Sequence, residues 1–262
     1  MSRASRGFRI AGILIRAISV SLVFGVIAFL LWRVFSSGIP KDIDKITVNH
    51  ALTEAYEEGD GNIYMFKQNP QKTTTAERNK GFFTVADYVI IPEADQIQVV
   101  FRYTNGAIRS LVENGKLSET PNMDDELFSV SLSMMKDLTP ENTEDNVGKD
   151  KSTVEYLRVY PDGEQTKRTQ KNLYNYYRFV FDISESGASL SEMLDSGELL
   201  AVYFDIYFVG DLDADGKVPT DPETGKESGS YGTLMLYEYL ADKERVFLSR
   251  AELNSIKNYK DE

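Results

Sequence analysis

The chain has 262 residues but no cysteine and a single histidine, which excludes disulfide bonds, cysteine-ligated metals, thiol nucleophiles and multi-histidine metal sites. Its 41 acidic residues outnumber its 29 basic residues, and the formal net charge is −12 at pH 7. A chain this acidic repels nucleic acid, so we expect no nucleic-acid partner.

The N-terminal region has the opposite charge. Residues 1–37 contain five arginines and no acidic residue, so the rest of the chain carries −17 rather than −12. Residues 17–32 contain no charge. Together with Val34 and Phe35 they would measure about 28 Å as a helix, close to the thickness of the hydrocarbon core of a membrane. We therefore predict a signal-anchor transmembrane helix over residues 17–35, which holds the protein in the lipid bilayer.

The charges on either side of this span predict its orientation. Arginines precede it and acidic residues follow it, so the positive-inside rule places residues 1–16 in the cytoplasm as a short basic segment. The C-terminal domain is then expected outside the cell membrane. The alternatives are a cleaved signal peptide and a buried core helix. The apolar stretch exceeds the about 7–15 apolar residues of a signal peptide, and the sequence WRVFSSG is a poor cleavage site, which favours a retained single-pass anchor.

Residues 36–48 contain Gly38 and Pro40 and are predicted to form a stalk. Residues 49–262 are predicted to form an extracytoplasmic β-rich domain. This domain is expected to open with a helix that Asn49 caps and Gly59 ends. His50, at the start of that helix, is interpreted as a capping or surface residue.

The domain continues as one strand after another. The clearest strand has Phe128, Val130, Leu132 and Met134 alternating with serines, which predicts one face in the core and one in water. The segment 199–210 is apolar apart from Asp205, which indicates a central strand covered on both faces and paired as a hairpin with residues 232–240. The other expected strands are 62–66, 82–91, 95–105, 126–135, 153–160 and 174–183, and capping boxes predict helices over 189–197 and 249–259.

This order of elements predicts a mainly β fold. Strands that follow strands, with only short helices between them, are typical of an antiparallel β-sandwich of immunoglobulin-like architecture. The alternative is an α+β domain with one curved sheet and its helices on a single face.

An acidic loop follows the central strand. Asp211, Asp213 and Asp215 alternate and Gly216 follows them, as at the opening of a calcium-binding loop. Prolines at positions 9 and 12 of the loop and strands on both sides exclude an EF-hand. A structural Ca²⁺ held by Asp211, Asp213, Asp215, Asp221 and Glu223 would offset the repulsion between these carboxylates. The competing interpretation is a solvated turn that has collected acidic residues.

Tyrosines provide a second candidate site. Tyr174 and Tyr176 alternate with core residues, and further tyrosines lie on the expected hairpin; outward-facing rings stack against sugars or a partner protein. The alternative is that these rings cover neighbouring elements. The hairpin tyrosines are Tyr203, Tyr207, Tyr237 and Tyr239.

The sequence contains no recognised catalytic motif, so we predict no catalytic residue. The expected function is that of a membrane-anchored extracytoplasmic binding module with a protein or glycan partner. The alternative is a carbohydrate-active or other hydrolytic enzyme, which would require two carboxylates in one aromatic-walled cleft.

The calcium hypothesis predicts a change in thermal stability. Because an ion that binds only the native state raises the unfolding midpoint, residues 38–262 should melt at a higher temperature in calcium than in chelator. An unchanged midpoint at millimolar calcium contradicts the hypothesis.

Overall fold

The computed structural model describes residues 16–32, 38–59, 63–67, 82–118, 126–137, 154–172, 174–219, 232–238, 245–247 and 250–260. The chain divides into two compact units, Met1–Ile39 and Pro40–Glu262. In the first unit, residues 16–32 form a helix whose side chains are all exposed. None of the helices in the described ranges combines the length and the apolarity that crossing a membrane requires.

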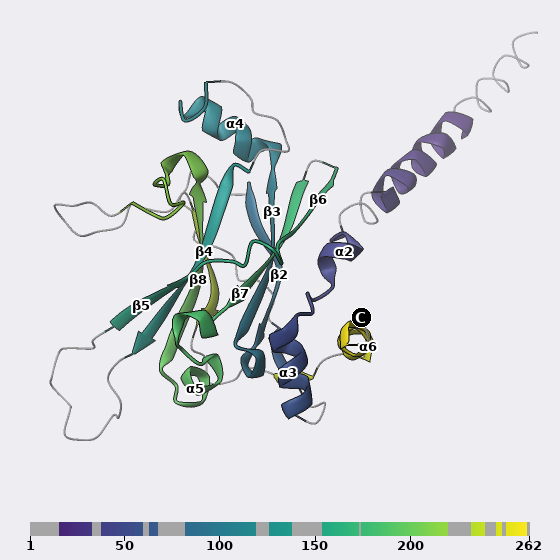
Figure 1. Ribbon diagram of the computed structural model, residues 1–262. Helices are drawn as coiled ribbons and strands as arrows, with labels where there is room; N and C mark the ends of the chain where they lie inside the picture. The colour runs from purple at the N-terminus through teal and green to yellow at the C-terminus, as the bar shows by residue number, and fades with distance from the viewer. Residues whose placement is uncertain are drawn as a thin grey trace, which may run out of the picture. The chain divides into compact units, whose positions relative to one another are not determined.

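The second unit is rich in antiparallel sheet (Figure 1). The six-stranded sheet has the order β10-β1-β2-β3-β7-β6, and the four-stranded sheet has the order β5-β4-β8-β9. Two separate sheets rule out the alternative of one curved sheet. The strands are β1 (Tyr64–Lys67), β2 (Phe83–Ile91), β3 (Gln96–Thr104), β4 (Phe128–Asp137), β5 (Val154–Val159), β6 (Lys167–Lys171), β7 (Tyr174–Asp182), β8 (Leu199–Phe208), β9 (Gly232–Glu238) and β10 (Arg245–Phe247).

The predicted strands are confirmed, as are the central position of β8 and its antiparallel pairing with β9. Two short strands were not predicted, β6 and β10. The sequence of β6 is KRTQK, which has no apolar residue and is a strand only because it pairs along its length with β7. Such pairing depends on residues distant in the sequence, so local periodicity does not reveal it.

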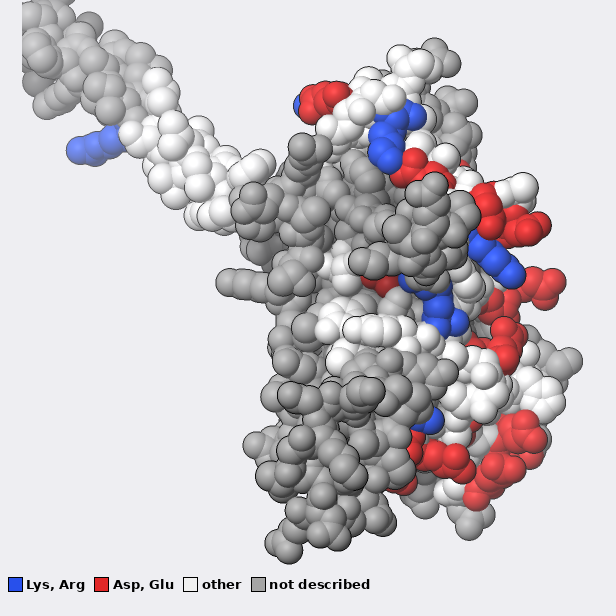
Figure 2. All heavy atoms as spheres, turned by 90° about the vertical axis from the view of Figure 1, so that its left-hand side faces the viewer, with Lys and Arg blue, Asp and Glu red and all other residues white. Residues whose placement is uncertain are grey.

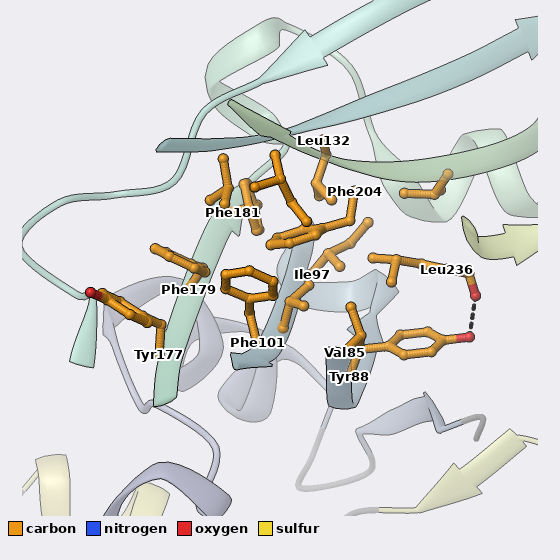
Figure 3. Close-up of a cluster of buried hydrophobic side chains, with 14 of the residues drawn as sticks. Val85, Tyr88, Ile97, Phe101, Leu132, Tyr177, Phe179, Phe181, Phe204 and Leu236 are labelled. Carbon is orange, nitrogen blue, oxygen red and sulfur yellow. Dashed lines mark hydrogen bonds between the residues drawn. The ribbon is translucent and has the colours of Figure 1, made fainter. Parts of the chain in front are cut away.

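One hydrophobic core contains side chains from both sheets. Phe101 of β3 and Phe181 of β7 point toward Phe204 of β8, with ring centroids 5.3 Å and 6.2 Å from that of Phe204 (Figure 3). Aromatic pairs at this spacing add about 0.5–1.5 kcal/mol each beyond the burial of their surface. At one end of the core, the hydroxyl of Tyr88 donates a hydrogen bond to the carbonyl of Leu236 and so links β2 to β9.

Helices cover parts of the sheets. The predicted helix at residue 50 is confirmed as α3 (His50–Glu58): the Asn49 side chain accepts from the Leu52 amide at 3.0 Å, and Gly59 is the C-cap. A second hydrophobic cluster, which includes residues of α3, β2 and α6, lies beside the main core. The other helices are α2 (Lys41–Asp44), α4 (Asn105–Glu113), α5 (Leu190–Asp195) and α6 (Arg250–Lys260). α4, which follows β3 directly, was not predicted.

The second unit begins at Pro40, inside the segment predicted to be a stalk. Ile43 and Ile46 of that segment are buried. The segment contacts the six-stranded sheet through Arg178 of β7, whose side chain is only 1% exposed. Its guanidinium donates from Nε to the carbonyl of Ile43 at 2.7 Å and from Nη2 to the carbonyl of Asp44 at 3.0 Å. Part of the expected stalk is thus integrated into the domain.

Gln98 of β3 completes this contact. Its side-chain oxygen accepts from Arg178 Nη1 at 3.1 Å and from the Thr47 amide at 2.8 Å, while its Nε2 donates to the Thr47 carbonyl at 2.8 Å. Burial lowers the pKa of Arg178 to about 10, and the negative charges of Asp87, Asp44 and Glu252 act in the opposite direction. The guanidinium is therefore still charged at neutral pH, and hydrogen bonds replace its lost water.

Arg178→Ala should lower the free energy of unfolding by about 3 kcal/mol, because two buried backbone carbonyls lose the donor that binds them and the Gln98 oxygen loses one of its two donors. Urea unfolding of the full chain in detergent measures the change. Arg109→Ala, which removes an exposed arginine from α4, should stay within about 0.5 kcal/mol of the parent. Equal effects of the two substitutions would contradict the assignment of Arg178 as a stabilising contact.

Candidate functional site

A groove lies on the four-stranded sheet, with a volume of about 490 Å³. We call it the outer groove. Its residues come from β5, β4, β8 and β9, so all four strands of the sheet contribute. The residues that line it are Ser133, Tyr156, Leu157, Arg158, Tyr203, Asp205 and Thr233.

The period of the strands places these residues on one face, apart from Leu157, which packs against the shared core. On β8, Phe204 and Ile206 belong to the shared core, so Tyr203 and Asp205 project from the opposite face. The strand register then sets polar side chains side by side: Ser133 is opposite both Tyr203 and Arg158. Asp205 is likewise opposite Thr233. The outer groove is therefore a cross-strand arrangement that no single strand encodes.

Asp205 is the buried charged group of the outer groove, with only 7% of its surface exposed. Its Oδ1 accepts a hydrogen bond from Thr233 Oγ1 at 2.6 Å, and its Oδ2 accepts from Ser133 Oγ. A carboxylate loses its hydration when it is buried, and such hydrogen bonds offset part of that cost. Both bonds come from neutral hydroxyl groups, which fix the orientation of the carboxylate without neutralising it.

Tyrosine and arginine side chains supply the rest of the chemistry. Tyr156 is 65% exposed and Tyr203 is partly exposed. Arg158, also partly exposed, has its Cζ 5.5 Å from the centre of the Tyr207 ring. Figure 2 views the protein from the side on which β5 lies in Figure 1, and it shows acidic side chains gathered there with lysines and arginines between them. The outer groove thus offers aromatic faces, one carboxylate and one guanidinium.

A second hollow, also of about 490 Å³, is bordered by Asp215, Gly216 and Lys217 of the acidic loop. Tyr177 also lines it, and the Tyr177 hydroxyl lies 3.4 Å from that of Tyr103. Burial raises the pKa of both phenols. They remain neutral at ordinary pH and serve as hydrogen-bonding groups.

The second hollow also meets the requirement for two carboxylates in an aromatic-lined space, since Glu126 and Asp215 both line it with Phe128 and Phe179. Both carboxylates are exposed, however. A general acid at neutral pH requires a carboxyl group whose pKa is raised, usually by burial. Among the lining residues that the structure describes, the second hollow has no buried carboxylate.

The described part of the acidic loop is held by hydrogen bonds of its own. Asp213 Oδ1 accepts from the amides of Asp215 at 3.0 Å and Lys217 at 2.7 Å, and Gly216 has a φ of +73°, which favours glycine. Asp211 forms an ion pair with Lys116. These contacts account for the conformation of the turn.

The five predicted calcium ligands are only partly described. Asp211, Asp213 and Asp215 lie in the described loop, whereas Asp221 and Glu223 lie outside the described residues. In the part of the chain that the structure describes, no three acidic or histidine side chains are grouped to hold a metal ion. The calcium site stays a prediction.

The predicted tyrosines fall in different places. Tyr176 is 1% exposed, and Arg102 lies over Tyr174, with its Cζ 4.6 Å from the centre of that ring. Tyr207 is buried, and Tyr203 lines the outer groove. The side chains of Tyr237 and Tyr239 lie outside what the structure describes.

Sequence reasoning missed most of the outer groove. Asp205 stood out as the only acidic residue of an apolar strand, but nothing local indicated that hydroxyls from two neighbouring strands would bind it. Tyr156 and Arg158 alternate on β5 in a way that signals an outward face. Their position beside Asp205 depends on the strand order.

Comparison of the chain with models of protein families, with curated proteins and with solved structures finds no match.

Asp205→Ala should lower the free energy of unfolding by about 1–3 kcal/mol, because the hydroxyls of buried Ser133 and partly buried Thr233 lose their acceptor. Urea unfolding measures the change. Asp195→Ala, which removes an exposed carboxylate from α5, should change stability by no more than about 0.5 kcal/mol. A neutral effect of Asp205→Ala would show that these hydrogen bonds do not stabilise the sheet.

Proposed function

We propose that the protein is a single-pass, membrane-anchored binding module whose ligand occupies the outer groove of an extracytoplasmic domain. Residues 17–35 are the transmembrane anchor, residues 1–16 are cytoplasmic and the unit from Pro40 onward lies outside the membrane. The charge asymmetry of the sequence supports this orientation. The helix over residues 16–32 exposes apolar side chains on every side, and lipid is the solvent that suits such a surface.

For the domain we propose an antiparallel β-sandwich of immunoglobulin-like architecture. The support is the core cluster, which contains inward-facing side chains of β2, β3 and β7 together with those of β4, β8 and β9. In a sandwich the two inner faces share one core in this way, and the outer faces are left for other roles. The proposal concerns the layers and not the strand order of immunoglobulins.

The outer groove is the observation that carries the binding function. Ligand sites combine exposed aromatic side chains with a few fixed polar groups, and Tyr156 and Asp205 provide this combination. Among the residues that the structure describes, the outer groove has one carboxylate, whereas glycoside hydrolysis requires a pair. We therefore favour a binding module over a hydrolytic enzyme.

The absence of cysteine allows a direct test of the topology. Glu164→Cys places a thiol at an exposed position of the domain, and Ser5→Cys places one in the predicted cytoplasmic segment. In protoplasts of a bacterial host that expresses the full chain, a membrane-impermeant maleimide should label the first variant. It should label the second only after the membrane is permeabilised.

The parent chain, which has no thiol, is the control for non-specific labelling. Labelling of Ser5→Cys but not Glu164→Cys in intact protoplasts would reverse the orientation. Recovery of the whole chain in the medium would show that no anchor is retained. Either outcome overturns this part of the proposal.

A further inference from the structure

We infer that the outer groove binds an uncharged carbohydrate, with a sugar ring stacked on Tyr156 and hydroxyl groups bonded to Asp205. This inference rests on the proposed binding function and specifies the chemical class of the ligand. Its evidence is the charge, the hydrogen-bonding capacity and the position of the residues that line the groove.

The charges of the outer groove favour a ligand without net charge. The seven lining residues that the structure describes include one carboxylate, Asp205, and one guanidinium, Arg158. The buried carboxylate would repel an anionic ligand, and the guanidinium would repel a cationic ligand. A neutral ligand meets neither repulsion and still gains charge-assisted hydrogen bonds from both groups.

Asp205 has hydrogen-bonding capacity for hydroxyl donors. A carboxylate offers about four acceptor positions, and within the described residues those of Asp205 accept two hydrogen bonds, from Ser133 and Thr233. Arg158, which lines the same groove, is a pure donor. Because a sugar hydroxyl both donates and accepts, the hydroxyl groups of a carbohydrate suit both a carboxylate and a guanidinium.

Tyr156 supplies a stacking surface at the side of the outer groove. Its ring is 65% exposed although it belongs to a strand in a sheet. An exposed ring presents an apolar face with a negative quadrupole, and the C–H-lined face of a sugar ring is a complementary surface. The groove volume of about 490 Å³ is within the range of small-ligand sites.

The position of the outer groove argues against an extended peptide. Peptides that bind sheets add a strand at an exposed edge, where backbone groups are unpaired. The outer groove instead crosses the face of the sheet from the edge strand β5 through β4 and β8 to β9, so its ligand meets side chains of four strands rather than the backbone of one edge. Recognition there depends on side chains, which suits a ligand rich in hydroxyl groups.

The test compares hexasaccharides that differ in charge, and chitohexaose and the glucosamine hexamer share one backbone. Saturation-transfer difference NMR and calorimetry on the full chain in detergent would use neutral hexasaccharides (chitohexaose, cellohexaose, mannohexaose and maltohexaose). The cationic glucosamine hexamer and an anionic galacturonate hexamer serve as charged probes. We expect at least one neutral hexasaccharide to bind and both charged hexamers to bind at least tenfold more weakly.

Variants locate the binding to the outer groove. Tyr156→Ala should weaken the binding about fivefold to tenfold through loss of stacking. Asp205→Asn should weaken it at least tenfold, because the amide replaces one acceptor with a donor. Tyr259→Ala is the matched control, since it removes a 46% exposed tyrosine from α6, and it should bind as the parent does. If Asp205→Asn fails to fold, Tyr156→Ala still tests the site, because Tyr156 is exposed and its substitution should not prevent folding.

The possible failures are distinct. A charged hexamer that binds more tightly than the neutral ones, and is lost in Tyr156→Ala, would overturn the neutral class but retain the groove as a binding site. Binding that is unchanged in both groove variants would overturn the site. The absence of binding by every hexasaccharide at millimolar concentration would overturn the carbohydrate inference, while the maleimide experiment judges the membrane topology independently.

Discussion

The buried guanidinium of Arg178 is the interaction on which the organisation of the domain depends. It lies on β7, bonds to Gln98 of β3 and holds the carbonyls of Ile43 and Asp44. Because a charged group in the interior is costly without hydrogen bonds, these partners must stay in place together. The contact therefore fixes the point on the six-stranded sheet at which the chain enters the domain, next to the boundary between its two units.

The two faces of β3 and β7 have different surroundings, one apolar and one polar. One face of β3 and β7 contributes Phe101, Phe179 and Phe181 to the shared core. The other face carries Arg178 and Gln98 beneath the segment that follows Pro40. The centre of the six-stranded sheet is consequently buried on both sides, although one side is polar. Hydrophobic packing and a hydrogen-bonded charge thus stabilise the same pair of strands.

The four-stranded sheet uses its buried charge differently. Arg178 directs each of its three guanidinium nitrogens to an oxygen of the protein. Asp205 instead accepts from two hydroxyls and lines a groove beside an exposed tyrosine. A charge that is bonded to the protein through every nitrogen serves stability, whereas a charge with acceptor capacity at a groove is suited to a ligand. This difference separates the structural contact from the candidate site.

The amino-acid sequence by itself determined most strands, the capped helix α3 and the pairing of β8 with β9, because period-2 alternation and caps are local properties. Only the tertiary structure decided that the polar faces of β4 and β7 are buried, with Ser133 and Arg178 inside rather than in water. It also decided that KRTQK is the strand β6, and that Asp205 faces a groove. All of these features depend on which segment, distant in the sequence, packs against the strand. The free energy of burying a polar residue depends on the partners that this segment provides. Periodicity assigns a side chain to a face, but the fold determines what covers that face.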